Sequence, residues 1–307
     1  MKPISTVYIL GMGAMGMLYG AQIQDAYGKD SFAFIMDEAR YDKHKDEVHN
    51  VNGVPYTFPV VRCDDAPAAD LIIVAVKGPV LKESLKTVAG VTGPDTIFVS
   101  IMNGISTEDV IRERFPEAHV VDAVNGGMDA VCLDKDLTFT HVGWLRLGSK
   151  DGSENEAAAC AYEYLKELRA KVTNLEQDIT RAIWFKYILN VGFNQTCMVY
   201  DCGYGKVLEE GSLENAIMVA AMREVVMIAE AEGIDLTEAD LRKTIDICKT
   251  FDPDGMPSMA QDRIKKRPSE VELFSGAIME LGAKHDILVP ANAFLNRRVH
   301  EIEAEYL

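Results

Sequence analysis

The chain has 307 residues, of which 48% are hydrophobic and 26% are charged, as in an ordinary globular protein. Its 31 Lys and Arg residues stand against 48 Asp and Glu residues, which gives a formal charge of −17. A field of that sign repels phosphate backbones and anionic lipids, so the composition argues against nucleic-acid and membrane partners. An anionic substrate would need local positive charge in its site.

Neither a membrane span, a disulfide framework nor a metal site is predicted. No apolar run reaches the roughly 18 to 20 residues that a bilayer span needs, and Gln22, Gln24 and Asp25 argue against a cleaved signal peptide. The six histidines show no HExxH or similar ligand spacing. Six scattered cysteines without a CxxC pair are typical of reduced thiols, so we expect a cytoplasmic protein. They are Cys63, Cys132, Cys160, Cys197, Cys202 and Cys248.

The first half of the chain alternates short apolar runs with helical stretches. A helix is expected over Met15 to Ala26. Continuous apolar strands indicate a parallel sheet that helices cover on both faces, hence an α/β fold with a Rossmann-type doubly wound sheet. The expected strands are Val7 to Leu10, Phe32 to Met36, Leu71 to Val76, Thr96 to Ile101, Val120 to Val124 and Leu145 to Gly148.

The second half, from about Ile179, is predicted to be all-helical. One helix is expected over Ala216 to Glu232, with Gly233 just past its end. The S-x-x-E pattern of Ser269 to Glu272 predicts a capping box before the apolar run Leu273 to Leu281. The change of pattern places a boundary near residues 175 to 180. We therefore expect a dinucleotide-binding domain over 1–178 and a helical substrate domain over 179–307.

A glycine motif directly follows the first predicted strand and opens the first helix. In G-x-G-x-x-G, the first glycine permits the tight turn, the second lets the backbone approach a pyrophosphate, and the third allows close helix–strand packing. The helix N-terminus offers N–H groups to the anion. This context predicts dinucleotide binding rather than a purely structural turn. The candidate cofactor-binding residues here are Gly11, Met12, Gly13, Ala14, Met15 and Gly16.

The residues after the second strand leave the choice of dinucleotide open. Asp37 follows that strand, and an acid here commonly binds the ribose 2′-hydroxyl of NAD(H). Arg40, Lys43 and Lys45 follow closely, and an arginine can instead pair with the 2′-phosphate of NADP(H). A third interpretation is that Asp37 only caps the next helix.

The segment from Trp184 to Asn194 combines polar and apolar residues in an unusual way. Lys186, Asn190 and Asn194 are spaced by four residues, so one helical face would carry all three. Their neighbours are aromatic or aliphatic, and burying a lysine with two asparagines is costly without a function. We predict a general acid with two amide hydrogen-bonding groups in a cleft. The alternative is a narrow solvent-facing stripe on an amphipathic helix.

Taken together, these motifs resemble the ketopantoate reductase (2-dehydropantoate 2-reductase) family over essentially the whole chain. The resemblance rests on the glycine motif, on Asn103-Gly104 after an apolar run, and on the W-x-K-x-x-x-N-x-x-x-N helix. It also rests on S-M-x-Q-D beginning at Ser258, with Glu270 twelve residues later. The resemblance implies NADP(H)-dependent reduction of a small 2-keto acid, ketopantoate, to pantoate for pantothenate biosynthesis, and it allows a homodimer.

The resemblance also implies roles for individual residues. Lys186 would be the general acid, and Glu270 would bond the substrate hydroxyl and hold it in register with the lysine. Asn103 would lie near the nicotinamide and the substrate. Asn190, Asn194 and Ser258 would bind polar groups of the substrate, and Lys77 would lie near the cofactor.

Simpler interpretations exist for several of these residues. Glu270 could merely start a helix, Ser258 and Asn103-Gly104 could merely form turns, and Lys77 could be an exposed loop charge. Two other functions also compete: a β-hydroxyacid or opine-type dehydrogenase acting on another 2-keto acid, and a dinucleotide-binding sensor without catalysis. The intact set of polar residues argues against the sensor, which would need only the glycine loop.

Overall fold

The computed structural model describes residues 1–173 and 176–307, which form two compact units. The first unit contains Met1–Met102 and Ser106–Ile179, and the second contains Asn103–Ile105 and Thr180–Leu307. Part of the region expected to hold the domain boundary, residue 175, lies outside the described residues. The short segment Asn103–Ile105 groups with the second unit although its flanking residues belong to the first, which the predicted boundaries did not anticipate.

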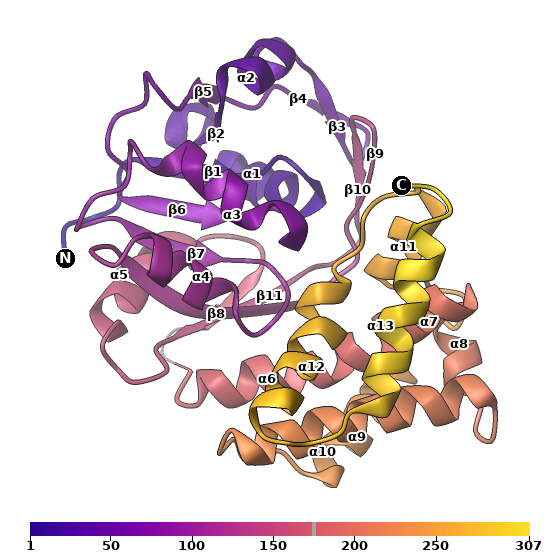
Figure 1. Ribbon diagram of the computed structural model, residues 1–307. Coiled ribbons are helices and arrows are strands. Elements are labelled where there is room, and N and C mark those ends of the chain that lie inside the picture. Colours follow the sequence, from indigo (N-terminus) through magenta and orange to yellow (C-terminus); the bar gives the residue numbers. More distant parts are fainter. Residues whose placement is uncertain (174–175) are drawn as a thin grey trace. The chain divides into compact units, whose positions relative to one another are not determined.

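The first unit is built on an eight-stranded sheet with the order β12-β11-β8-β7-β6-β1-β2-β5 (Figure 1). All the strands predicted from apolar runs are present, with slightly different ends. Neighbours pair in parallel except β8 and β11, which are antiparallel. The strands are β1 Val7–Leu10, β2 Ala33–Met36, β5 Val60–Arg62, β6 Leu71–Val74, β7 Ile97–Ser100, β8 His119–Met128, β11 Val142–Gly148 and β12 Lys171–Thr173.

Helices cover both faces of this sheet, which confirms the doubly wound prediction. In β1, Val7 and Ile9 pack into one apolar cluster, whereas Tyr8 and Leu10 pack into another on the opposite face. Because successive side chains of a strand point to opposite faces, a strand buried on both sides must be apolar throughout. The first cluster includes residues of α1 (Ala14–Tyr27) and α5 (Asn155–Leu165), and the second includes residues of α3 (Leu81–Ser84), the 3-10 turn Leu85–Val88 and α4 (Thr107–Arg114).

A second, four-stranded sheet with the order β4-β3-β10-β9 was not predicted. Its strands are only three residues long, and β3 and β10 also contain polar residues, so none of the four forms an apolar run of ordinary strand length. The short helix α2 (Glu38–His44) precedes it. The strands are β3 His49–Val51, β4 Val54–Tyr56, β9 Val131–Leu133 and β10 Asp136–Thr138.

The described part of the second unit is helical, as predicted, around one apolar core. The helix expected over Ala216 to Glu232 is α9 (Leu213–Ala231), and Gly233 follows with a φ of 75°, which favours glycine. The other helices are α6 Ile179–Leu189, α7 Gln195–Tyr200, α8 Tyr204–Val207, α10 Glu238–Cys248, α11 Ser258–Ile264, α12 Ser275–Lys284 and α13 Pro290–Glu303.

The capping box predicted at Ser269 to Glu272 is wrong. The segment forms a separate 3-10 turn, Val271–Leu273, and α12 begins only at Ser275. The Ser269 backbone N–H donates to the buried carboxylate of Glu303, and the exposed Glu272 carboxylate lies 2.8 Å from a ring nitrogen of His300. Tertiary partners on α13 therefore replace the local reciprocal bonds that the pattern predicts.

No helix within residues 1–173 and 176–307 is long and apolar enough to cross a membrane.

Candidate active site

The glycine loop between β1 and α1 has the backbone geometry that a dinucleotide needs. Gly11 has a φ of 107°, and a Cβ there would lie 2.7 Å from the carbonyl oxygen of Ala75. A Cβ on Gly16 would lie 1.9 Å from the carbonyl oxygen of Gly11. A Cβ on Gly13, by contrast, would meet no described atom within 4 Å. Gly11 and Gly16 are thus fixed by packing, whereas Gly13 leaves open space where a pyrophosphate could approach.

The N-terminus of α1 adds to this cradle. Gly13 is the N-cap residue, no described side chain caps the helix, and its first turn contains no acidic residue. The helix is 14 residues long, so its N-terminal end carries the partial positive charge of a full-length helix. These features fit the phosphates of a dinucleotide.

Asp37 lies where β2 ends and α2 begins, and it does cap that helix. Its Oδ1 accepts a hydrogen bond of 2.8 Å from the Arg40 backbone N–H. The Arg40 Nε lies 3.7 Å from Asp37 Oδ2, and both side chains are about half exposed. Capping occupies one carboxylate oxygen of Asp37 and leaves the other accessible. Asp37 and Arg40, the acidic and the basic candidate for binding the ribose, are therefore neighbours.

Of the remaining cationic candidates, Lys45 pairs with Asp42 at 2.9 Å. Lys77 follows β6 as the exposed N-cap residue of a short 3-10 turn, Gly78–Val80. An exposed position fits both a cofactor contact and the simple loop charge that was considered as the alternative.

In the second unit, Asn103 joins Lys186 and Glu270 in one hydrogen-bonded network. The Lys186 Nζ donates to Asn103 Oδ1 at 3.0 Å, and Asn103 Nδ2 donates to Glu270 Oε2 at 3.1 Å. Lys186 is half-buried and the Glu270 side chain is buried. The asparagine thus bridges an ammonium and a carboxylate from segments far apart in the chain, and it fixes the direction of both charged groups.

The local backbone explains how these residues come together. Gly104 has a φ of 102°, so the chain turns sharply directly after Asn103. Ile105 then packs against the helical core, and a Cβ on Gly104 would lie 3.5 Å from Leu273 Cβ. Glu270 precedes the 3-10 turn Val271–Leu273. The turn and the packing of its flanking residues therefore hold Asn103 against the segment that carries Glu270.

A second polar cluster lies farther along the same helical segment. Asn194 Nδ2 donates to Asn190 Oδ1 at 3.3 Å, and Ser258 Oγ donates to Asn194 Oδ1 at 2.9 Å. Asn190 and Asn194 are 5% and 4% exposed, so the alternative of a solvent-facing stripe is wrong. Ser258 is the first residue of α11 and does more than form a turn, because its side chain bonds to another helix.

The backbone around these asparagines is not a regular α-helix. Asn190–Asn194 forms a π-helical turn between α6 and α7, which the sequence did not reveal. A π turn widens the helix by one residue and is frequently found at functional sites. Gly192 lies inside it, and a Cβ there would come within 2.4 Å of Met222 Cγ, so only glycine lets this turn approach α9.

Tyr187 is a site-supporting residue that the sequence analysis missed. Its hydroxyl donates to the carbonyl oxygens of Leu273 at 2.9 Å and of Phe274 at 2.7 Å. Full burial raises the pKa of this phenol well above its usual value, so it remains a neutral donor. Tyr187 therefore ties the segment after Glu270 to the helix that carries Lys186. The sequence did offer one indication of this role, because Tyr187 directly follows Lys186 in an otherwise apolar helix.

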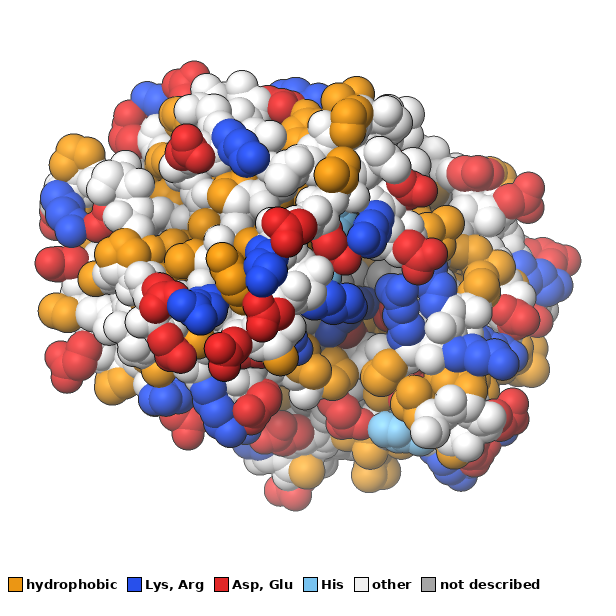
Figure 2. Space-filling model, turned by 90° about the horizontal axis from the view of Figure 1, so that it is seen from above, with side chains coloured by type: hydrophobic (Ala, Val, Ile, Leu, Met, Phe, Trp, Pro, Cys, Tyr) orange, Lys and Arg blue, Asp and Glu red, His pale blue; other side chains and the backbone are white. Residues whose placement is uncertain are grey.

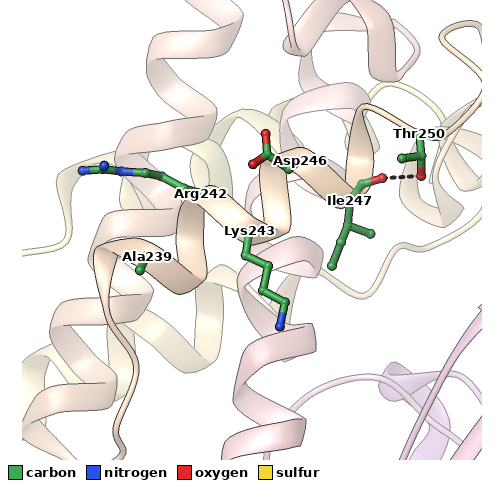
Figure 3. Close-up of a pocket in the computed structure, with 6 residues that line it drawn as sticks. All are labelled: Ala239, Arg242, Lys243, Asp246, Ile247 and Thr250. Atoms are coloured by element: carbon green, nitrogen blue, oxygen red, sulfur yellow. Dashed lines mark hydrogen bonds between the residues drawn. The ribbon is translucent and has the colours of Figure 1, made fainter.

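A shallow groove elsewhere on the second unit lies over α10 and the turn that follows it (Figure 3). All its lining residues come from this one stretch, and none of the predicted site residues, all of which are described, is among them. Lys243 lies over the Phe185 ring, 5.4 Å from its centroid. Acidic and basic side chains are intermingled over the face seen in Figure 2. Neither the groove nor the mixed charged face is therefore a better candidate for the active site than the two polar clusters described above.

Family comparisons cover both parts of the chain. The family model described as "Ketopantoate reductase PanE/ApbA" matches residues 7–147, and its C-terminal counterpart matches residues 178–303. A 2-dehydropantoate 2-reductase of Streptococcus pyogenes serotype M1 is 28% identical, with 97% of this chain and 98% of the relative covered. One from Aquifex aeolicus is 25% identical, with 95% and 94% covered.

Solved structures show the same fold. A D-mandelate dehydrogenase in complex with NADH is 25% identical, with a TM-score of 0.85 over 98% of this chain and 100% of the other. A dimeric ketopantoate reductase from Staphylococcus aureus is 18% identical, with a TM-score of 0.83 and the same coverage. At the latter identity the likeness concerns the fold alone.

Proposed function

Because the chain belongs to the ketopantoate reductase family, we propose that it reduces the 2-keto group of ketopantoate to the hydroxyl group of pantoate with a nicotinamide dinucleotide. Such an enzyme is an oxidoreductase of 2-keto acids and would serve pantothenate biosynthesis. The observation that carries the proposal is the bridge from Lys186 through Asn103 to Glu270, in a chain that also has a dinucleotide loop. A sensor without catalysis would not need that bridge.

A dinucleotide held by the glycine loop would supply the hydride for the new C–H bond at the keto carbon. The electron pair of the carbonyl π bond moves to oxygen, and Lys186 donates a proton from its ammonium group to that oxygen. The reaction leaves Lys186 neutral, and a proton from solvent restores it. The ammonium also stabilises the negative charge that develops on the oxygen, which supplements general acid catalysis.

The other polar residues would position the lysine and the substrate. Asn103 accepts from Lys186 and donates to Glu270, so it directs the ammonium group and holds the carboxylate that would accept a hydrogen bond from a substrate hydroxyl. Asn190, Asn194 and Ser258 would bind the remaining polar groups of the substrate, because amides and hydroxyls both donate and accept. Binding there would exchange the present side-chain bonds for bonds to the substrate.

For the cofactor, we propose that both dinucleotides are accepted and that Asp37 weakens the preference for NADPH that the family implies. An accessible carboxylate repels a 2′-phosphate and favours a free 2′-hydroxyl, whereas Arg40 beside it favours the phosphate. The proposal predicts that Asp37→Asn raises kcat/KM for NADPH relative to NADH and that Arg40→Ala lowers it. An unchanged ratio in both variants would show that these two side chains do not contact the ribose.

The function is tested by steady-state assays of the purified chain with a panel of 2-keto acids and both reduced dinucleotides. The proposal predicts the highest kcat/KM with ketopantoate. Turnover of another 2-keto acid with none of ketopantoate would favour the alternative of a related dehydrogenase. One solved structure with this fold is a D-mandelate dehydrogenase. A phenyl-substituted 2-keto acid therefore belongs in the panel.

We further propose a cytoplasmic homodimer. The dimeric ketopantoate reductase of Staphylococcus aureus shares the fold, and the free cysteines and the charge of −17 fit a reducing compartment without anionic surfaces as partners. Light scattering on the purified chain at assay concentration tests this assembly. A monomer mass at full activity would contradict it.

A further inference from the structure

Three potential metal ligands meet in the first unit, in a part of the chain that the proposed reaction does not use. His44 is the last residue of α2, Glu47 follows in the turn, and His49 is the first residue of β3. One ligand atom from each of the three lies within 4.8 Å of the others. The His44 Nδ1 is 2.5 Å from Glu47 Oε2, and the His49 Nε2 is 3.5 Å from the same oxygen.

His49 is the feature that needs an explanation. Its side chain is buried, and neither ring nitrogen has a hydrogen-bond partner among the described residues. An imidazole carries at least one N–H, and buried polar groups almost always have partners in native proteins. The neighbouring Phe58 ring, 5.8 Å away between centroids, cannot supply one. A bound ion is one of the few things that would satisfy such a histidine.

A neighbouring lysine orients the carboxylate of the cluster. Lys135 Nζ lies 3.0 Å from Glu47 Oε1, which leaves Oε2 directed at the two histidines. Lys135 thus orients the Glu47 carboxylate from the side opposite the histidines, although its positive charge also repels a cation.

We propose that His44, Glu47 and His49 bind a Zn²⁺ ion through one ring nitrogen of each histidine and one carboxylate oxygen. Two imidazoles and a carboxylate are a ligand set that Zn²⁺ accepts, with a fourth position left for water. In tetrahedral geometry with metal–ligand bonds of about 2.0–2.2 Å, ligand atoms lie about 3.3–3.6 Å apart. The separation of 3.5 Å between His49 and Glu47 matches that range, whereas the separation of 2.5 Å between His44 and Glu47 is shorter, so the His44 ring would move away from the carboxylate. Zn²⁺ would replace the present contact between His44 and Glu47.

The site would tie the end of α2 to the start of β3. A helix of seven residues is marginal by itself, and its other end carries Asp37 as its N-cap. Metal bound to the folded state alone must also raise the stability of that state. The motif was invisible in the sequence because its ligands, spaced by three and two residues, span a helix end, a turn and a strand start.

The experiment is Zn²⁺ binding by isothermal titration calorimetry and thermal unfolding, on the full chain after chelator treatment. We expect one Zn²⁺ per chain and a higher Tm with Zn²⁺ than without it. His44→Gln and Glu47→Gln should each weaken binding at least about tenfold and remove the Tm shift. These two positions are chosen because replacing the buried His49 could prevent folding.

The matched control is His141→Gln. His141 Nδ1 lies 3.2 Å from Asp129 Oδ2, so it is another histidine–carboxylate pair, but it is exposed and outside the cluster. We expect this variant to bind Zn²⁺ like the wild type. The proposal is overturned if the wild type does not bind Zn²⁺, or if binding persists in His44→Gln and Glu47→Gln, as it would if the cysteine thiols were the ligands.

Discussion

Replacing Asn103 by alanine tests whether the bridge between Lys186 and Glu270 matters for catalysis. The change removes an acceptor 3.0 Å from the lysine ammonium and a donor 3.1 Å from the buried carboxylate. A hydrogen bond to a charged group contributes about 1.5–3 kcal/mol. If one such bond is needed to direct the ammonium in the transition state, kcat falls by about 10- to 150-fold, since about 1.4 kcal/mol is a factor of ten. The assay is oxidation of the reduced dinucleotide at saturating ketopantoate.

Two further variants sharpen this test. Asn103→Asp keeps an acceptor for Lys186 but loses the donor to Glu270 and places two carboxylates side by side, so we expect it to be impaired as well. Asn50→Ala removes an amide-to-carboxylate bond of 2.6 Å to Asp136 in the small sheet, and we expect kcat to remain at the wild-type value. A kcat for Asn103→Ala within twofold of the wild type, with the fold intact by circular dichroism, would refute the role of the bridge.

Two further predictions concern stability. Glu224, which is buried, accepts bonds from the N–H groups of Ala291 and Asn292 at 2.7 and 2.8 Å, so Glu224→Gln should lower the free energy of unfolding by about 1–3 kcal/mol in urea titrations; an unchanged midpoint would contradict this. Burial raises the pKa of Glu108 to about 7, so the folded state holds a proton that the unfolded state loses at lower pH. The free energy of unfolding therefore falls as the pH rises towards 7. Glu108→Gln cannot lose this proton, so the Tm of the variant relative to the wild type should be higher at pH 8 than at pH 5; an equal difference in Tm at both pH values would contradict this.

Much of the first unit could be predicted because its buried strands are continuous apolar runs. Leu71–Val74 and Ile97–Ser100 are buried throughout, and a parallel sheet covered on both faces demands that composition. The strands of the small sheet were not predicted, because a strand of three residues such as His49–Val51 is too short to show a periodic pattern. The capping box failed for a different reason: its serine N–H found a tertiary acceptor, Glu303, that no local pattern contains.

The candidate site was predictable in its helical part only. Spacing by four residues placed Asn190 and Asn194 together, and they are bonded, although through a π turn that sequence periodicity could not distinguish from an α-helix. The contact between Asn103 and Glu270 joins residues 167 positions apart, and nothing in either segment by itself indicates the other. Only the family resemblance suggested both as site residues, and the hydrogen bond between them comes from the structure.

The most direct measurement of the central claim, that Lys186 is the general acid of a ketopantoate reductase, is kcat of Lys186→Ala with ketopantoate and saturating dinucleotide. Lys206→Ala, which removes an exposed lysine paired with Glu209, is the matched control and should behave like the wild type. Loss of general acid catalysis predicts a fall of kcat by at least about a hundredfold in Lys186→Ala. A near wild-type kcat in that variant would contradict the account.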